Sequence, residues 1–351
     1  MCKGAVGNGP GPGFARKACG YGLILAVVPY AAMKVMWLSG YPIGVPEGSP
    51  AAGSEFAAAN VITLGMDIVA VVLALALTQN WGMRIPAAPV LATGWVGTGL
   101  LVPTVLQVPA GLVHGLLTSG QAVDMEGGLV TDTAYAVVYG SFALQGALLS
   151  AAFLLYSRER WADVFVFVPS TAEGSTRAHA QRAIAAAAAA GALCVGTVSI
   201  TGALLAPPGW NDVWTPESRL TLGLYSAVVL TAVPGVLIMV GSPLVPERLR
   251  RRPFGVGATL TWIGSGALFG WGGFRTLAQV MRAPMSDLAA PVERVTDLVA
   301  MLSGLAIGVL GVLLLAEVRD RAVDREWPPA AAAHIRQRFR AQSAPPSLES
   351  R

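Results

Sequence analysis

Long apolar stretches without charged residues are the feature that most restricts how this chain folds. Only 13% of its 351 residues are charged and 54% are hydrophobic, and the mean hydropathy is +0.59. Soluble domains carry about 25% charged residues. Because a bilayer span needs about 20 mostly apolar residues, the sequence predicts an all-α integral membrane protein. We expect eight transmembrane helices, at 19–39, 57–79, 88–116, 133–156, 183–206, 220–241, 254–280 and 295–317.

The positions of the basic residues predict the orientation of these helices. With a cytoplasmic N-terminus, 19 of the 24 Lys and Arg residues fall in cytoplasmic segments. The loops on the other side hold only Arg219, Arg282 and Arg294. Cytoplasmic loops of membrane proteins carry an excess of Lys and Arg, so we expect a plasma-membrane protein with both termini cytoplasmic. The isoelectric point near 9.1 then reflects topology, and we expect no nucleic-acid partner.

An internal repeat divides the chain into two halves. The stretch RIPAAPVLATGWVGTGLL (84–101) returns as RRPFGVGATLTWIGSGAL (251–268), with six of eighteen positions identical at an offset of 167. Shorter matches accompany the second and fourth spans of each half. Four spans per unit is an even number, so the sequence predicts a tandem, parallel duplication of a four-helix unit, unlike the inverted repeats of many transporters. The Gly-x-Gly pairs are best interpreted as sites where helices pack closely.

The repeat and the spans predict five regions. Residues 1–18 form a cytoplasmic N-terminus and residues 318–351 a basic, partly disordered cytoplasmic tail. Between them lie a first four-helix repeat, a cytoplasmic linker and a second four-helix repeat, at 19–156, 157–182 and 183–317. The tail contains HIRQRFR at 334–340, which we expect to bind anionic lipids of the inner leaflet.

Lys34 is the first ionisable residue inside a predicted span. Such a residue costs roughly 2.5–3.5 kcal/mol on insertion scales, so it is a functional candidate by default. Tyr30 and Trp37 lie four residues before and three after it, on the same helical face, where their rings offer cation–π contacts. The alternative is a lysine whose side chain extends to the nearby outer interface.

Asp67 lies near the middle of the second span, too deep for a short side chain to reach the interface. Asn60 and Thr63 lie seven and four residues earlier and extend a polar stripe toward the outer surface. A buried carboxylate without a partner takes up a proton, and a neutral carboxylic acid suits a proton donor or carrier. The alternative is a structural hydrogen bond between helices.

Arg275 lies near the outer end of the seventh span, one turn after Trp271. A buried arginine needs a carboxylate partner. Asp67, Asp132 and Asp297 all qualify, and the sequence does not choose among them.

Asp132 and Asp297 open the fourth and eighth spans at corresponding points of the repeat. Tyr135 and Tyr139 share a face with Asp132, three and seven residues later. Both aspartates suit either catalysis or helix capping, in which a carboxylate satisfies free amides of the first turn. His114, near the outer end of the third span, is interpreted as an interfacial histidine or a substrate contact. One polar pocket, opening outward or sideways into the outer leaflet, is expected to collect the ionisable residues of the outer half, with Asp67 below them: Lys34, His114, Asp132, Arg275 and Asp297.

The cysteines and histidines predict neither a metal nor a cofactor. Cys2, Cys19 and Cys194 are far apart and form no CxxC motif, and no second histidine stands at metal-ligand spacing from His114. The expected partners are therefore the bilayer itself and a lipophilic small-molecule substrate.

The segment PYAAMKVMW (29–37), together with the eight-span layout and the Ala/Gly/Val/Arg-rich composition, resembles a group of actinobacterial membrane proteins. Members of that broad kind occur in isoprenoid natural-product pathways as membrane terpene cyclases. The DDxxD-type motif of enzymes that ionise diphosphates is absent. The resemblance therefore implies a cyclase that begins by protonating an alkene or an epoxide.

Three functions remain open from the sequence. The first is an intramembrane acid catalyst with Asp67 or Asp132 as the proton donor, tuned by Lys34 or Arg275. Its substrate would be isoprenoid or similarly lipophilic, and a developing cation would face the rings of Tyr30, Trp37, Tyr135 and Tyr139. The second is a proton-coupled exporter or permease that uses Asp67 as the carrier. The third is a non-catalytic membrane scaffold or sensor.

Overall fold

The computed structural model describes residues 12–49, 51, 53–118, 120, 129–166, 176–205, 216–282 and 289–326. Every regular element in these ranges is a helix, so the expected all-α architecture is confirmed there. Most of the predicted N-terminal segment, and the stretch 334–340 that is expected to bind lipids, lie outside the described residues.

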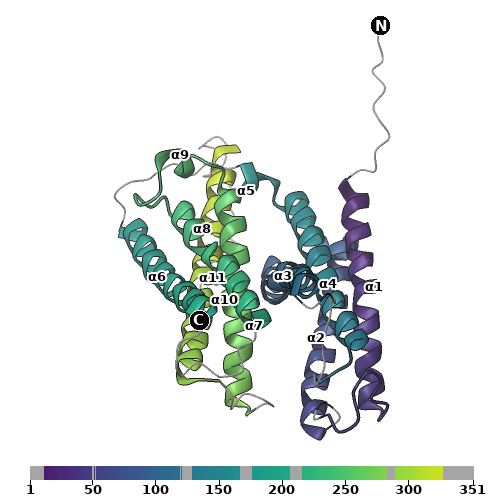
Figure 1. Cartoon of the computed structure of the whole chain (residues 1–351). Helices are drawn as coiled ribbons and strands as arrows, with labels where there is room; N and C mark the ends of the chain where they lie inside the picture. The colour runs from purple at the N-terminus through teal and green to yellow at the C-terminus, as the bar shows by residue number, and fades with distance from the viewer. Residues whose placement is uncertain are drawn as a thin grey trace, which may run out of the picture.

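Four long helices form the N-terminal half, drawn in purple to teal in Figure 1. They are α1 (Pro12–Leu38), α2 (Ser54–Thr78), α3 (Ala87–Thr118) and α4 (Asp132–Arg160), with the 3-10 helix η2 (Asn80–Met83) between α2 and α3. Each contains nearly all of the apolar stretch from which it was predicted. Pro29 lies inside α1, and Pro103 and Pro109 lie inside α3. Membrane helices tolerate such prolines because neighbouring groups satisfy the freed carbonyls.

The described part of the C-terminal half contains seven helices, of which α7 and α8 together form one long segment. They are α5 (Ala162–Val166), α6 (Thr176–Leu205), α7 (Pro216–Leu230), α8 (Ala232–Met239), α9 (Glu247–Arg250), α10 (Phe254–Val280) and α11 (Pro291–Glu326). The bounds of α10 equal those of the predicted seventh span. Helix α11 begins four residues before the predicted eighth span and continues well past its end.

The sixth predicted span, 220–241, is divided at Thr231 into α7 and α8. Pro234 explains the break, because it has no N–H to offer the carbonyl of Leu230 one turn earlier. The Thr231 hydroxyl lies 2.7 Å from the carbonyl oxygen of Val228 and 3.2 Å from that of Leu260 in α10. The hydroxyl of Thr231, at the break, therefore connects the α7–α8 segment to α10.

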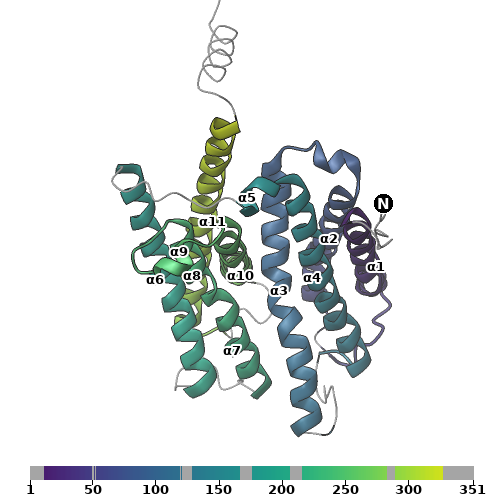
Figure 2. The same ribbon diagram turned by 90° about the horizontal axis from the view of Figure 1, so that it is seen from above.

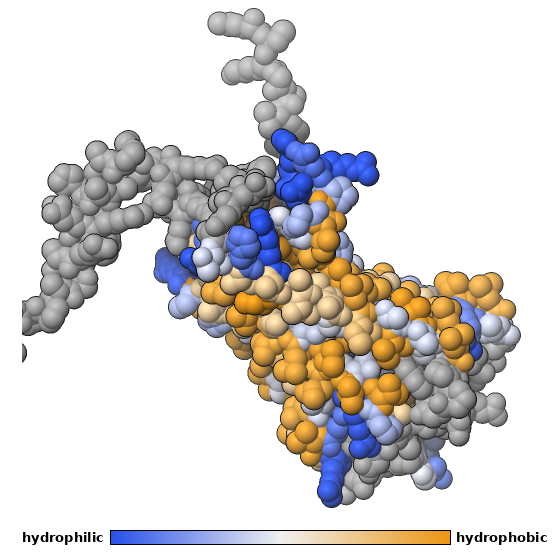
Figure 3. Space-filling view, turned by 90° about the vertical axis from the view of Figure 1, so that its left-hand side faces the viewer, coloured by the Kyte–Doolittle hydropathy of each residue, from blue (hydrophilic) through white to orange (hydrophobic). Residues whose placement is uncertain are grey.

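Among the residues that the structure describes, seven segments are long enough and apolar enough to cross a membrane: α1, α2, α3, α4, α6, the α7–α8 pair and α11. Helix α10 has 27 residues but is not among them, because its many Gly, Ser, Thr and Trp residues lower its hydropathy. The face in Figure 3 is largely hydrophobic between hydrophilic groups at its top and bottom. These properties suit a multi-pass integral membrane protein.

The two ends of the bundle differ in charge. The end where α1 begins and α4 ends, uppermost in Figure 1, carries α5, α9 and most of the arginines, and we call it the basic end. The other end, which carries loop 39–53, is called the distal end. At the basic end Arg16 pairs with Glu159 at 3.0 Å. Arg160 donates a hydrogen bond to the carbonyl of Ile85, just before α3, at 2.5 Å. The charged groups therefore also tie α1, and the segment that leads into α3, to α4.

The repeated stretches meet where α3 packs against α10, side by side in Figures 1 and 2. The indole N–H of Trp95 donates to the Ser265 hydroxyl at 3.1 Å. The indole of Trp262 donates to the Thr98 hydroxyl at 2.8 Å. Trp95 and Trp262 are equivalent in the repeat, as are Thr98 and Ser265, so each copy makes the same bond to the other.

The neighbours of equivalent helices also correspond. In the first half α1 packs on α2 and α4, and α3 packs on α4. In the second half α6 packs on α7 and α11, and α10 packs on α11. These pairs correspond, but others do not: α10 packs closely on α8, whereas α2 and α3 scarcely touch. Helices α3 and α10 lie at the junction between the halves.

Candidate functional site

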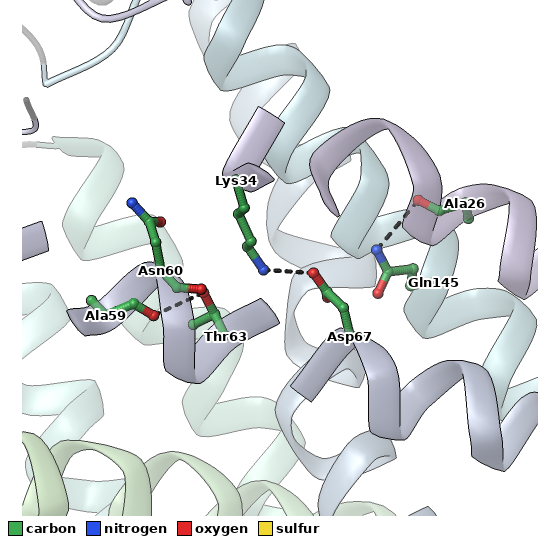
Figure 4. Close-up of polar contacts among 7 residues, drawn as sticks. All are labelled: Ala26, Lys34, Ala59, Asn60, Thr63, Asp67 and Gln145. Atoms are coloured by element: carbon green, nitrogen blue, oxygen red, sulfur yellow. Dashed lines mark hydrogen bonds and ion pairs between the residues drawn. The ribbon is translucent and has the colours of Figure 1, made fainter. Parts of the chain in front are cut away.

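Lys34 and Asp67 form an ion pair inside the N-terminal half (Figure 4). The Lys34 Nζ lies 2.7 Å from Asp67 Oδ2, and the two side chains are 1% and 8% exposed. The ammonium also stands 3.9 Å from the centre of the Tyr30 ring. The alternative of a lysine that extends to the interface is therefore wrong, because its side chain is directed to α2.

Aromatic rings from α1 and α4 form a row that ends at Lys34. Tyr30 contacts Phe142 edge-on with ring centres 5.1 Å apart, and Phe142 contacts Tyr139 at 6.2 Å. Tyr139 lies 4.3 Å from Tyr135, and Tyr30 also contacts Trp37 at 6.2 Å. The four aromatic residues expected from the sequence are thus contiguous, and Phe142 is the link that the sequence did not identify.

A cavity of about 180 Å³ lies on the distal side of the ion pair. Trp37 lies one turn beyond Lys34 on α1, and Asn60 lies two turns beyond Asp67 on α2. Both line the cavity, together with Leu38, Gly40, Pro42, Val45, Ala51, Gly53 and Ala57. Most of these residues have apolar side chains or none, but the lining surface is nearly as polar as apolar because backbone groups and Asn60 contribute to it. The Asn60 amide makes no hydrogen bond to the described residues.

Loop 39–53 is fixed over this cavity by three bonds. The Trp37 indole donates to the carbonyl of Ile43 at 2.8 Å. The backbone N–H of Thr131 donates to the carbonyl of Gly44, also at 2.8 Å. The Ser49 hydroxyl donates to the carbonyl of Leu129 at 2.9 Å. The segment before α4 thus helps to hold the mouth of the cavity.

On the basic side of the ion pair the polar groups soon end. Gln145 of α4 is 2% exposed, and its amide lies 3.3 Å from the Ala26 carbonyl (Figure 4). Beyond Gln145 the centre of this half is filled by buried apolar side chains: Leu23, Leu73, Ala74, Leu77, Leu149 and Ala152. The polar groups around the Lys34–Asp67 pair therefore do not continue toward the basic end.

Arg275 and Asp297 form a separate constellation in the C-terminal half, between α10 and α11. Arg275 Nη1 lies 3.4 Å from Asp297 Oδ1, and the Gln279 amide donates to Oδ2 at 3.1 Å. The guanidinium lies 5.6 Å from the Tyr225 ring and 5.5 Å from the Trp271 ring. Among the three carboxylates left open by the sequence, Arg275 thus pairs with Asp297. The expected residues are divided between two sites and do not line a single pocket.

The capping interpretation fails for Asp297, whereas Asp132 lies in the first turn of α4, where a carboxylate suits the helix dipole. Asp132 is exposed and is the first residue of α4, but the cap is Thr131, whose side chain accepts a hydrogen bond from the Ala134 amide. Asp297 lies in the second turn of α11, because that helix begins earlier than predicted; Glu293 instead accepts from the Ala290 amide at 2.8 Å. Asp297 is therefore not a cap.

His114 lies half-buried near the distal end of α3, and no contact that it makes joins it to either ion pair. Within the ranges that the structure describes, no three His, Cys, Asp or Glu side chains come close enough to hold a metal ion. The structure thus separates His114 from the charged residues with which it was grouped.

Gln145, Tyr225 and Gln279 are the polar contacts that the sequence did not single out. Each had a signal: Gln145 is an amide inside an apolar stretch, and Gln279 follows Arg275 by one helical turn. Tyr225 stands at the repeat position of Asp67, at an offset of 158.

No protein-family model matches the chain, and neither a curated protein nor a solved structure shows significant similarity to it.

Proposed function

We propose that this protein is a membrane-embedded enzyme that uses the Lys34–Asp67 pair as an acid–base group on a lipophilic isoprenoid substrate. The observation that carries the proposal is the position of this pair. It is buried, it lies at the end of a row of aromatic rings, and a cavity of mixed polarity lies on its distal side. The resemblance of segment 29–37 to membrane terpene cyclases favours a prenylated substrate.

The chemistry needs only a proton. In the pair, one proton is shared between the Lys34 amine and the Asp67 carboxylate, and donating it to an alkene or epoxide leaves a substrate cation. Losing a proton from a neighbouring carbon then returns it to the pair, so the reaction is an isomerisation or cyclisation without a cofactor. General acid–base catalysis of this kind contributes about 10²–10⁴-fold.

The aromatic row supplies what the cation needs. The faces of Tyr30, Tyr135 and Tyr139 carry negative potential, which stabilises a nearby cation without trapping it covalently. Trp37 and Asn60 line the cavity, whereas Lys34 and Asp67 do not. A substrate in the cavity therefore reaches the pair by displacing these two side chains.

Transport is the weaker alternative because a proton-coupled carrier needs polar groups on both sides of its carrier residue. The apolar side chains on the basic side of Gln145 leave no such path in the described part of the first half. No specific contact favours the scaffold or sensor hypothesis.

The proposal includes the topology expected from the sequence. Helix α10, at about 1.5 Å per residue, is long enough to be an eighth span. Cytoplasmic loops carry an excess of Lys and Arg, so the arginines of the basic end support the proposal that this end and both termini are cytoplasmic, in a cell whose plasma membrane contains the protein. The reciprocal Trp95 and Trp262 bonds support a duplicated four-helix unit, and the tail is proposed to bind anionic lipids.

The test is product analysis with membranes that contain the protein. A panel of prenylated aromatic compounds, with and without a terminal epoxide, is supplied in D₂O. One deuterium in an unepoxidised product marks protonation of an alkene carbon. We expect Asp67→Asn to lower turnover at least about 100-fold, and Glu47→Gln, an exposed carboxylate at the same end, to retain it.

Two results would contradict the proposal: no product from any member of the panel, or unchanged turnover in a folded Asp67→Asn variant. Size-exclusion profiles establish that the variant is folded. If Asp67→Asn does not fold, Tyr30→Leu serves instead, since it removes the ring over Lys34 and keeps the ion pair. We expect a slower reaction and a shift toward products of early cation capture.

A further inference from the structure

Asn60 lines the distal cavity with a polar side chain that the protein itself does not use. Its amide carries two N–H donors and a carbonyl acceptor, and none of these has a hydrogen-bond partner among the described residues. The side chain is half-buried, and in Figure 4 it extends away from Asp67. Polar groups removed from water without a partner cost free energy, so a ligand that supplies the partner binds favourably here.

The other donors around the cavity are already used. The indole N–H of Trp37 is bonded to the carbonyl of Ile43. The backbone N–H groups of Gly40 and Val45 donate to carbonyls three residues earlier, both at 3.1 Å. Apart from Trp37 and Asn60, the described lining residues have apolar side chains or none. The free side-chain donors of the described lining are therefore those of Asn60.

The described lining of the cavity carries no charged side chain. An ionised head group buried there would need an opposite charge beside it. Lys34 and Asp67 neutralise each other at 2.7 Å, and neither lines the cavity. The cavity of about 180 Å³ therefore suits a neutral head group with a hydroxyl or carbonyl oxygen, and does not suit a phosphate or a carboxylate.

The cavity and the ion pair lie at different depths of the same helical face. Asn60 and Asp67 are seven residues apart on α2, which is two turns and about 10.5 Å along the axis. Thr63 lies between them, and its hydroxyl already donates to a backbone carbonyl at 2.9 Å. On α1, Trp37 lines the cavity and contacts the Tyr30 ring that stands over the ammonium. A chain that leaves the cavity toward the pair thus passes aromatic rings.

We propose that Asn60 binds the neutral oxygen of the substrate's head group and so sets how far the hydrocarbon tail reaches toward the Lys34–Asp67 pair. The proposal rests on the acid–base function proposed above and names the residue that decides where that chemistry takes place. With the head at Asn60, a double bond beside the head stays in the cavity. Only a double bond near the far end of the tail reaches the pair and is protonated.

Binding is measured with a probe that cannot react. The probe is tritiated ortho-geranylphenol with a fully hydrogenated chain, and a second probe lacks only its hydroxyl group. Each is bound to the full-length protein in nanodiscs, and empty nanodiscs give the amount that dissolves in lipid. We expect the protein to prefer the hydroxyl probe by about two- to tenfold, as one neutral hydrogen bond implies. Asn60→Leu should lose this preference.

Two further variants show that the preference belongs to the amide at this position. Asn80→Leu makes the same change at an exposed residue of η2, and it should bind both probes as the unchanged protein does. Asn60→Gln retains an amide and should still prefer the hydroxyl probe. If Asn60→Leu does not fold, Asn60→Ala serves in its place. Equal binding of the two probes to the unchanged protein would overturn the proposal, and so would an undiminished preference in Asn60→Leu.

A second arm locates the deuterium in products formed from unreduced ortho-geranylphenol in D₂O. We expect it at the terminal double bond with the unchanged protein, and at both double bonds with Asn60→Leu. The same distribution in the two proteins would overturn the positioning role of Asn60. A clear binding preference without any product would refute the acid–base function and support the assignment of Asn60. Product formation without a binding preference would refute that assignment alone.

Discussion

Gly99 and Gly266 lie against each other where α3 packs on α10. A Cβ atom on Gly99 would overlap the carbonyl group of Gly266, and one on Gly266 would stand 3.0 Å from the carbonyl oxygen of Trp95. Backbone therefore meets backbone at this point, as in other membrane helix pairs with small residues at their interface. The two halves of the protein depend on this contact.

We expect Gly99→Leu to separate α3 from α10 and to destabilise the protein. Extra side-chain atoms in a well-packed interface cost about 1–3 kcal/mol, and here the obstacle is backbone, which does not rotate away. Thermal unfolding in detergent measures the effect. Gly65→Leu in α2 is the control, because nothing lies within 4 Å of its Cβ position; equal melting temperatures for the two variants would show that the close contact is not needed.

The Lys34–Asp67 pair predicts a loss of stability that a second substitution restores. Lys34→Met leaves the Asp67 carboxylate buried without a partner, which costs about 3–5 kcal/mol, whereas an apolar pair of similar volume is often neutral or stabilising. We therefore expect Lys34→Met to lower the melting temperature and Lys34→Met with Asp67→Leu to restore it. The restored protein should still be inactive. Full activity in the double variant would contradict the catalytic role of the pair.

The reciprocal tryptophan bonds predict equal coupling in the two copies of the repeat. Loss of one neutral hydrogen bond costs about 0.5–1.5 kcal/mol. A double-mutant cycle of Trp95→Phe with Ser265→Ala isolates that energy, and a second cycle pairs Trp262→Phe with Thr98→Ala. We expect the same coupling from both cycles. A coupling near zero in one of them would mean that this bond does not hold the halves together.

The proposed topology predicts opposite labelling of two engineered cysteines. Cys2, Cys19 and Cys194 are first replaced by serine. Glu47→Cys, in loop 39–53, should react with a membrane-impermeant maleimide on intact cells, because the distal end faces outward in this topology. Arg248→Cys, in α9, should react only after the cells are permeabilised. The reverse pattern would invert the protein in the membrane and move the cavity mouth to the cytoplasmic side.

The helices themselves were largely predictable from the sequence. Hydropathy measures the free energy of transferring a local segment into lipid, and a helix satisfies its own backbone hydrogen bonds there. The ends of α3 and α10 therefore agree with the expected spans to within two residues. The division at Thr231 was missed although Pro234 was a visible signal. The early start of α11, which places Asp297 inside the helix, was also missed.

The candidate sites were predictable only as a set of residues. Sequence spacing put Tyr30 and Lys34 on one face of α1, and the structure has the ammonium over that ring. The sequence did not pair Lys34 with Asp67, and it left three carboxylates as possible partners of Arg275. Nor did it separate the two constellations, because distance between helices is not encoded in the spacing along one helix.

The sequence by itself thus determined which segments are apolar helices, where the arginines gather, and which residues carry charge inside the apolar segments. Only the tertiary structure decided the partners. Whether Lys34 meets Asp67, or Arg275 meets Asp297, depends on the rotation and depth of each helix against its neighbours. Those are set by close packing at positions such as Gly20, which lies against Thr78 of α2, and Gly272, which lies against the backbone of Asp297 and Met301 in α11.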